Sequence, residues 1–197
     1  LDHSVWHRFT ANWPDVKVYI PEGEVSYLTS KQYFLEHIGI QSPNLRSQWD
    51  TFMTEKTVYT PLDNYLTYRP GDTFSSLETL CQVIGTPGHS PAHSSFYFPE
   101  LQILFTGDLG IDRFGPWYGW ADCNLADFVQ SILQLKSLPI RYLLTSHGGL
   151  FTQDFDQHFD RLLAMMRQRE NKIAELLDKG LNRREIAEEG IFYKKDK

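Results

Sequence analysis

The hexapeptide Gly85-Thr-Pro-Gly-His-Ser90 follows a β-prone run, and the rest of the chain is best interpreted outward from it. Glycine permits positive φ angles and close backbone approach, so a histidine flanked by glycine can leave a strand and enter a pocket. Glycine again stands beside an acid or a histidine in Thr106-Gly-Asp108 and Ser146-His-Gly-Gly149. Each motif is expected at the end of a strand, where side chains from separate elements can share one cleft.

A fourth motif, Asp2-His3, stands at the beginning of the sequence. With His89, Asp108 and His147 it gives a set of imidazole and carboxylate groups without a nearby pair of thiolates. Such donors suit zinc, and also iron or manganese. A structural zinc site would be closed by four ligands, so we interpret this set as an open catalytic site. A metal ion lowers the pKa of bound water from about 15.7 to about 7, which makes hydroxide available near neutral pH.

In their order and spacing these motifs resemble the metallo-β-lactamase-fold hydrolases, especially the glyoxalase II-like and lactonase-like members. That family carries a His-x-His-x-Asp-His motif, a later Gly-His, a Gly-Asp and a final His-Gly, which build a two-metal site between two β-sheets. Leu1-Asp-His3 matches the last three positions of the first motif, and gaps of 86, 19 and 39 residues separate the four motifs. Four motifs in one order are a specific signal, whereas any one alone is weak.

The resemblance implies a role for each matched residue. Asp2, His3 and His147 would hold one metal ion. His89 would contribute to a second, and Asp108 would bridge the two. Asp2 would also orient the bridging hydroxide or accept its proton as a general base. The expected cofactor is one or two ions of zinc, with iron or manganese as alternatives. The family's two preceding histidines would lie before the first residue given, so we expect the sequence to begin inside this motif.

An unusually aromatic segment follows the third motif, and two interpretations of it remain open. Trp117, Tyr118 and Trp120 would wall an apolar substrate pocket, or they would simply pack in a loop. Arg113 would meet an anionic group of the substrate, or it would pair with Asp112.

Of the other histidines, His93 is the strongest candidate for a place in the site. It lies four residues after His89. We expect it to pack, or to make a hydrogen bond that supports the site, rather than to ligate a metal.

Strands and helices alternate through the middle of the sequence. A hairpin is expected from Ser94–Phe98 and Gln102–Thr106, then a helix over Leu125–Leu135 and a strand over Arg141–Thr145. Residues 22–56 are expected to be irregular with short helices and a loop at 41–44. The other expected strands cover residues 16–20, 57–60, 65–68 and 78–84.

The last fifty residues are helical in period. Apolar residues from Phe155 to Leu177 predict a long helix that Gly180 ends. A short second helix follows, and Asn182 with Glu185 forms its capping box. The pattern predicts an α/β architecture. With the resemblance it becomes an αββα sandwich lacking its N-terminal strands, in which residues 1–152 form the domain and 153–197 a helical extension packed on it.

Composition restricts the class of partner. The 197 residues include 19 Lys and Arg against 25 Asp and Glu, a net charge of −6, and no cluster of basic residues, which argues against nucleic acid. No apolar run approaches the roughly 18 residues that cross a bilayer, so no membrane partner is expected. Two cysteines, Cys81 and Cys123, are too few for a disulfide framework and favour the cytoplasm. The expected partners are a small-molecule substrate and, at most, a second copy of the chain.

Together these observations predict a metal-dependent hydrolase. Metal-held hydroxide would attack an ester, thioester, lactone or related carbonyl. The alternative is a catalytically silent protein whose fold serves binding or assembly, with an incomplete metal site.

Overall fold

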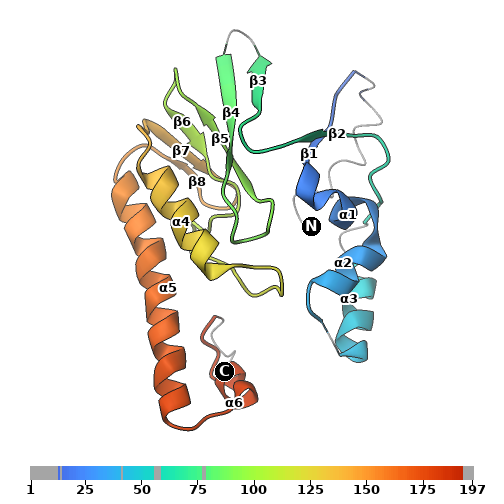
Figure 1. The fold of residues 1–197 in the computed structure, drawn as a ribbon, viewed down its shortest axis with the longest axis vertical. Coiled ribbons are helices and arrows are strands. Elements are labelled where there is room, and N and C mark those ends of the chain that lie inside the picture. Colours follow the sequence, from blue (N-terminus) through green and yellow to red (C-terminus); the bar gives the residue numbers. More distant parts are fainter. Residues whose placement is uncertain (1–12, 14, 41, 56–58, 77–78, 193–197) are drawn as a thin grey trace.

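Six strands form one sheet in the computed structural model, which describes residues 13, 15–40, 42–55, 59–76 and 79–192 (Figure 1). β6 and β7 are parallel neighbours, and every other neighbouring pair in this sheet is antiparallel. β4, β6 and β7 therefore run in one direction, and their carboxyl ends lie at the same edge. In sheet order the strands are β3 (Thr73–Ser76), β4 (Thr79–Gly85), β5 (Ser94–Phe98), β6 (Ile103–Phe105), β7 (Tyr142–Thr145) and β8 (Gly149–Phe151).

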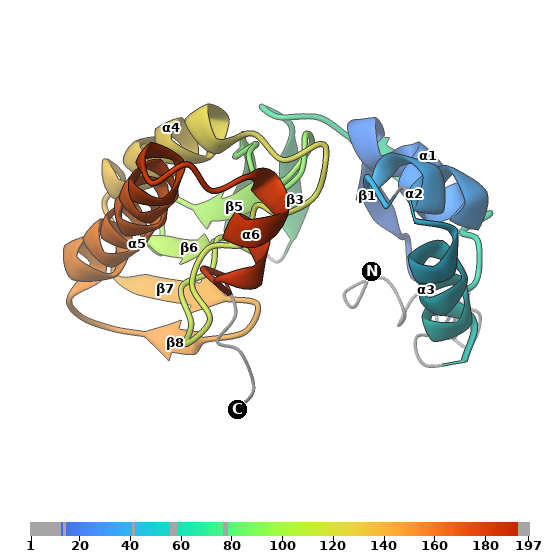
Figure 2. The ribbon, with the colours of Figure 1, turned by 90° about the horizontal axis from the view of Figure 1, so that it is seen from below.

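Two amphipathic helices cover one face of this sheet, as Figure 2 shows. α4 (Leu125–Lys136) is the crossover between β6 and β7, and α5 (Phe155–Asp178) follows β8. Their apolar faces bury the main core against the sheet. The core consists of Tyr97, Leu104, Leu109, Ile111, Phe128, Ile132, Leu135, Leu143, Phe159, Leu162 and Met166. Among the helices of the described residues, none is long and apolar enough to cross a membrane.

A smaller group of elements lies beside the sheet, away from α4 and α5 (Figures 1 and 2). β1 (Tyr19–Pro21) pairs in parallel with β2 (Leu66–Tyr68). Leu35, Ile38 and Met53 form the buried centre of the group, with Trp49 and Trp120 packed against it. Its helices are a 3₁₀ turn at Glu22–Glu24, α1 (Val25–Thr29), α2 (Lys31–His37) and α3 (Pro43–Glu55).

The predicted α/β architecture is confirmed, and so is the first strand of the hairpin, Ser94–Phe98. The short last helix, α6 (Arg183–Glu188), begins with the predicted capping box of Asn182 and Glu185. The loop expected at 41–44 is wrong in its second half, because α3 begins at Pro43. Proline is tolerated in the first turn of a helix, where its missing N–H has no intrahelical partner to lose.

Several strand predictions differ from the structure at their ends. Residues 16–18 are not in a strand, and β1 instead includes Pro21. Residues 59 and 60 are not in a strand, while 57 and 58 lie outside the described residues. β3 and β8 were not expected, because both are short and have polar or glycine residues in place of an alternating pattern.

Candidate functional site

Three strands deliver three predicted ligands to one edge of the sheet. His89 lies four residues beyond the end of β4, Asp108 three beyond β6 and His147 two beyond β7. Since these strands run in the same direction, the side chains meet. His147 Nε2 lies 3.1 Å from Asp108 Oδ1, and His89 Nε2 lies 3.8 Å from Asp108 Oδ2. Asp2 and His3 lie outside the described residues, so their predicted roles stay predictions.

The Asp108 carboxylate turns a different oxygen toward each imidazole. Two atoms that bind one tetrahedral zinc ion lie about 3.4 Å apart, since Zn–N and Zn–O bonds are about 2.0 to 2.2 Å long. The observed 3.1 and 3.8 Å lie on either side of that value. The donor chemistry and spacing therefore fit a carboxylate between two cation positions. Within the described ranges, no three His, Cys, Asp or Glu side chains converge on a single position.

The imidazole of His89 is fixed by its other nitrogen. Nδ1 lies 3.0 Å from the carbonyl oxygen of Trp117, to which only a protonated nitrogen can donate. In the neutral ring Nε2 then carries the free lone pair that a metal requires, and it faces Asp108. The backbone carbonyl of His89 accepts a hydrogen bond from Cys123 Sγ at 3.0 Å. Burial raises the pKa of Cys123 to about 11, which keeps this donor protonated.

The loop that carries His89 is held against the start of α4. The Asn124 N–H donates to the carbonyl of Gly88 at 3.0 Å, and Ser131 Oγ donates to the carbonyl of Pro87 at 2.8 Å. Gly88 has a φ of +133°, and a Cβ there would lie 2.3 Å from the Cβ of Phe128. Only glycine fits this position, so the glycine before His89 serves the close approach that the sequence indicated.

His93 supports the site, as the sequence predicted. Its Nε2 accepts a hydrogen bond from the backbone N–H of Asp108 at 3.0 Å. Its Nδ1 lies 2.9 Å from the carbonyl oxygen of Thr86 and must carry the proton. These two bonds define a neutral imidazole and tie the β4 loop to the β6 loop. Gly107 permits this approach, because it has a φ of +62° and its Cβ would lie 2.8 Å from His93 Nε2.

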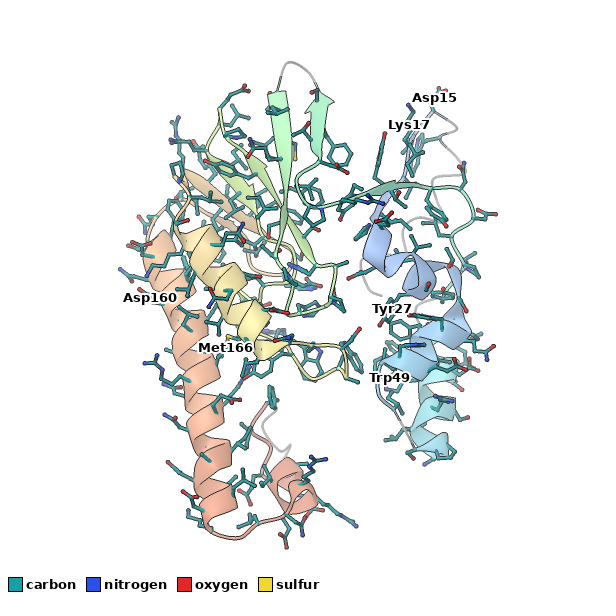
Figure 3. The ribbon with its side chains drawn as sticks, viewed as in Figure 1. Asp15, Lys17, Tyr27, Trp49, Asp160 and Met166 are labelled. Carbon is teal, nitrogen blue, oxygen red and sulfur yellow. The ribbon has the colours of Figure 1, made fainter. Side chains whose placement is uncertain are left out.

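A cavity of about 780 Å³ opens at His89, Asp108 and His147. Trp49 of α3 contacts Trp120 edge-on, with ring centroids 5.3 Å apart, and so joins the helical group to the loop after β6. Figure 3 labels Trp49 on α3. We call this the aromatic cavity, since its walls include Phe34, Trp49, Phe52, Phe114, Trp117, Trp120 and Phe192.

The structure separates the residues of the predicted substrate loop. Trp117 and Trp120 line the aromatic cavity, whereas Tyr118 is not part of its lining. The Tyr118 ring packs edge-on against Phe128 and Phe192 instead. Arg113, the fourth residue predicted to contact substrate, lines a second cavity.

Arg169 of α5 contributes to the walls of the candidate site, and the sequence did not predict it. Only 9% of it is exposed, and it lines the aromatic cavity. Nη1 donates to the carbonyl of Pro116 at 2.5 Å, and Nη2 to that of Phe114 at 3.4 Å. The guanidinium also lies 4.7 Å from the centre of the Phe192 ring. A signal was present: Arg169 follows Met166 by three residues, so it stands on the apolar stripe of the helix.

Comparison with known proteins matches the chain to one family. The model of the metallo-beta-lactamase superfamily matches residues 1–147. A metallo-beta-lactamase family protein from Thermus thermophilus is 27% identical, with a TM-score of 0.62 over 82% of this chain and 56% of its own. A metallo-beta-lactamase superfamily protein from the archaeon Sulfolobus tokodaii is 19% identical, with a TM-score of 0.54 over 82% of this chain and 62% of its own.

A third solved structure, of a protein in a di-iron-bound form, is 22% identical, with a TM-score of 0.53 over 78% of this chain and 68% of its own. The chain spans 56% and 62% of the lengths of the first two proteins. No curated protein matches the sequence.

Proposed function

The chain belongs to the metallo-beta-lactamase superfamily, and from this premise we propose that it hydrolyses an ester, thioester or lactone by metal-dependent chemistry. Membership supports a metal-dependent hydrolase-type function. One observation carries the finer proposal. The Asp108 carboxylate stands between the Nε2 atoms of His89 and His147, each of which faces a different oxygen.

The chain's own residues prepare this site for a metal. His89, Asp108 and His147 would hold it, with Asp2 and His3 as further predicted ligands. A bound divalent ion supplies Lewis acidity and lowers the pKa of water toward about 7. Zinc is the proposed ion, and iron or manganese would suit the same donors.

In the proposed reaction water adds to the carbonyl carbon, the bond from that carbon to the leaving oxygen or sulfur breaks, and the leaving atom takes the proton. Two of the chain's features act on this reaction. The hydrogen bond to the Trp117 carbonyl holds His89 in the required tautomer. The walls of the aromatic cavity offer an apolar surface to an acyl group beside the site.

A catalytically silent binding protein is the second candidate. It is favoured by the observation that no three potential ligands converge on one position among the residues that the structure describes. Metal binding separates the two candidates, since a silent protein of this kind would retain no transition metal after dialysis.

The test combines metal content with hydrolysis. The chain is reconstituted with zinc, iron or manganese, dialysed, and assayed by mass spectrometry of bound metal and against a panel of aryl esters, thioesters and lactones. Asp108→Asn and His147→Ala should lose metal and hydrolysis together. His37→Ala is the matched control, because His37 is exposed on α2, lines neither cavity and bonds through Nδ1 to the carbonyl of Tyr33 in its own helix. Unchanged metal content and hydrolysis in His147→Ala would refute the proposal.

A further inference from the structure

A second cavity of about 590 Å³ adjoins the candidate metal site. It shares part of its wall with the aromatic cavity, namely Gly110, Asp112, Phe114 and His147. His147 therefore faces both spaces. Since the loop that follows β6 also contributes to both walls, a ligand positioned at His147 can extend into both cavities.

The second cavity differs in charge from the chain as a whole. The chain carries a net charge of −6, yet two arginines, Arg113 and Arg161, line this one cavity beside a single acid, Asp112. Arg161 and His158 come from α5, and Arg113 comes from the shared loop. We call it the cationic cavity.

Of the two acids next to these arginines in sequence, Asp112 lines the cavity itself and Asp160 does not. Asp112 Oδ1 accepts hydrogen bonds from the backbone N–H groups of Phe114, at 2.6 Å, and Gly115, at 3.0 Å. Asp160, which precedes Arg161 and is labelled in Figure 3, forms an ion pair with Lys136 of α4 at 2.5 Å. The first acid shapes the loop and the second ties two helices together.

Arg113 and His158 each contact an aromatic neighbour. The Arg113 guanidinium lies 4.7 Å from the centre of the Phe114 ring, and the His158 ring packs 4.3 Å from that of Phe151. Planar guanidinium groups suit bidentate binding of carboxylate or phosphate. The cavity thus presents an arrangement of donors for an anion.

We propose that the substrate has two parts: an apolar acyl group in the aromatic cavity and an anionic leaving group, bearing phosphate or carboxylate, at Arg113 and Arg161. This inference rests on the proposed hydrolase function. His89 and Asp108 line the aromatic cavity and are not part of the cationic lining, so the carbonyl lies on the aromatic side. Arg113 and Arg161 are exposed, so the charged leaving group can depart to solvent.

Three thioesters of phenylacetic acid test the proposal. Their thiols are 2-methoxyethanethiol, 3-mercaptopropionate and 2-mercaptoethyl phosphate, which share a two-carbon linker to sulfur and end in a neutral ether, a carboxylate or a phosphate. The wild-type chain is compared with the double variant Arg113→Ala/Arg161→Ala and with Arg167→Ala. Arg167 is an exposed arginine of α5 that lines neither cavity. The measured quantity is the ratio of kcat/KM for each anionic thioester to that for the neutral one.

In the double variant this ratio should fall about tenfold or more, mainly through KM, because two charge-assisted contacts are lost. It should stay within about twofold of wild type in Arg167→Ala. Whichever anionic thioester shows the larger fall in this ratio, the phosphate or the carboxylate, identifies the group that the arginines prefer. An equal loss for neutral and anionic thioesters, or no loss, overturns the inference.

Calorimetry with 2-mercaptoethyl phosphate and 3-mercaptopropionate gives a readout independent of turnover. At least one should bind the wild-type chain and bind the double variant more weakly by about tenfold. If a thiol binds the wild-type chain and binds the double variant more weakly, while no thioester is hydrolysed, the proposed function fails and the anion site stands. If thioesters are hydrolysed without any preference and neither thiol binds, the anion site fails and the proposed function stands.

Discussion

Replacing Arg169 by methionine should destabilise the protein and loosen the site at the same time. Methionine keeps much of the length of the side chain but removes the donors to the carbonyls of Pro116 and Phe114. It also removes the cation above the Phe192 ring. The loop that these contacts hold leads directly to Trp117, whose carbonyl fixes His89.

The size of the expected loss in the free energy of unfolding follows from these contacts. A hydrogen bond from a charged donor contributes about 1.5 to 3 kcal/mol, and the bond of 3.4 Å to Phe114 is the weaker of the two. The cation–π contact adds about 0.5 to 2 kcal/mol. Removing the desolvated charge of Arg169 offsets part of this loss. The net cost should be about 3 kcal/mol, or about 6 to 12 °C in Tm for a chain of this size.

The assay is thermal and urea unfolding, with Arg167→Met as the matched control. Arg167 is exposed on the same helix, so its replacement should change the free energy of unfolding by no more than about 0.5 kcal/mol. Reconstituted Arg169→Met should also retain less metal than Arg167→Met under the same dialysis. Equal Tm and equal metal content in the two variants would refute the reasoning.

Three further predictions follow from single contacts. Gly107→Ala should cost about 1 to 2 kcal/mol in urea unfolding, because it places a Cβ 2.8 Å from His93 Nε2 at a positive φ; a neutral effect would contradict the role of this glycine. Asn124→Ala should cost about 1 kcal/mol, because the Asn124 side chain caps α4 by accepting from the N–H of Asp127; circular dichroism during unfolding measures it. The pKa of Cys123 is raised from 9.0 to about 11, so the folded state binds the extra proton and stability should fall as pH rises from 9 to 11; Cys123→Ser should reduce that slope, and an identical slope would contradict the assignment.

Three of the five ligands predicted from the sequence lie together in the structure, and their role as ligands stays a prediction. His89, Asp108 and His147 were found because each stands beside glycine after a strand, and chain direction then brings such residues together. The edge of the sheet at which a strand ends depends on the direction of that strand. Direction is set by pairing with distant segments, which the local sequence pattern does not encode.

Three features were not predicted, because each depends on contacts or conformations that the local sequence does not specify. α3 was not expected because Pro43 at its first position indicates a loop as readily as a helix start. Arg169 lies on an apolar stripe, and its carbonyl partners come from residues 53 and 55 positions earlier in the chain. Tyr118 and Trp117 are neighbours in sequence, yet only the folded loop shows that Trp117 lines the cavity and Tyr118 packs on the core.

Metal bound per chain, measured by mass spectrometry after reconstitution and dialysis, tests the central claim most directly. The wild-type chain should retain about one or two ions of zinc, iron or manganese, and Asp108→Asn should lose most of them, because this carboxylate faces both imidazoles. Hydrolysis of the ester and thioester panel should fall in proportion to the metal lost. A wild-type chain that retains no transition metal, or an Asp108→Asn variant that retains as much as wild type, would contradict the account.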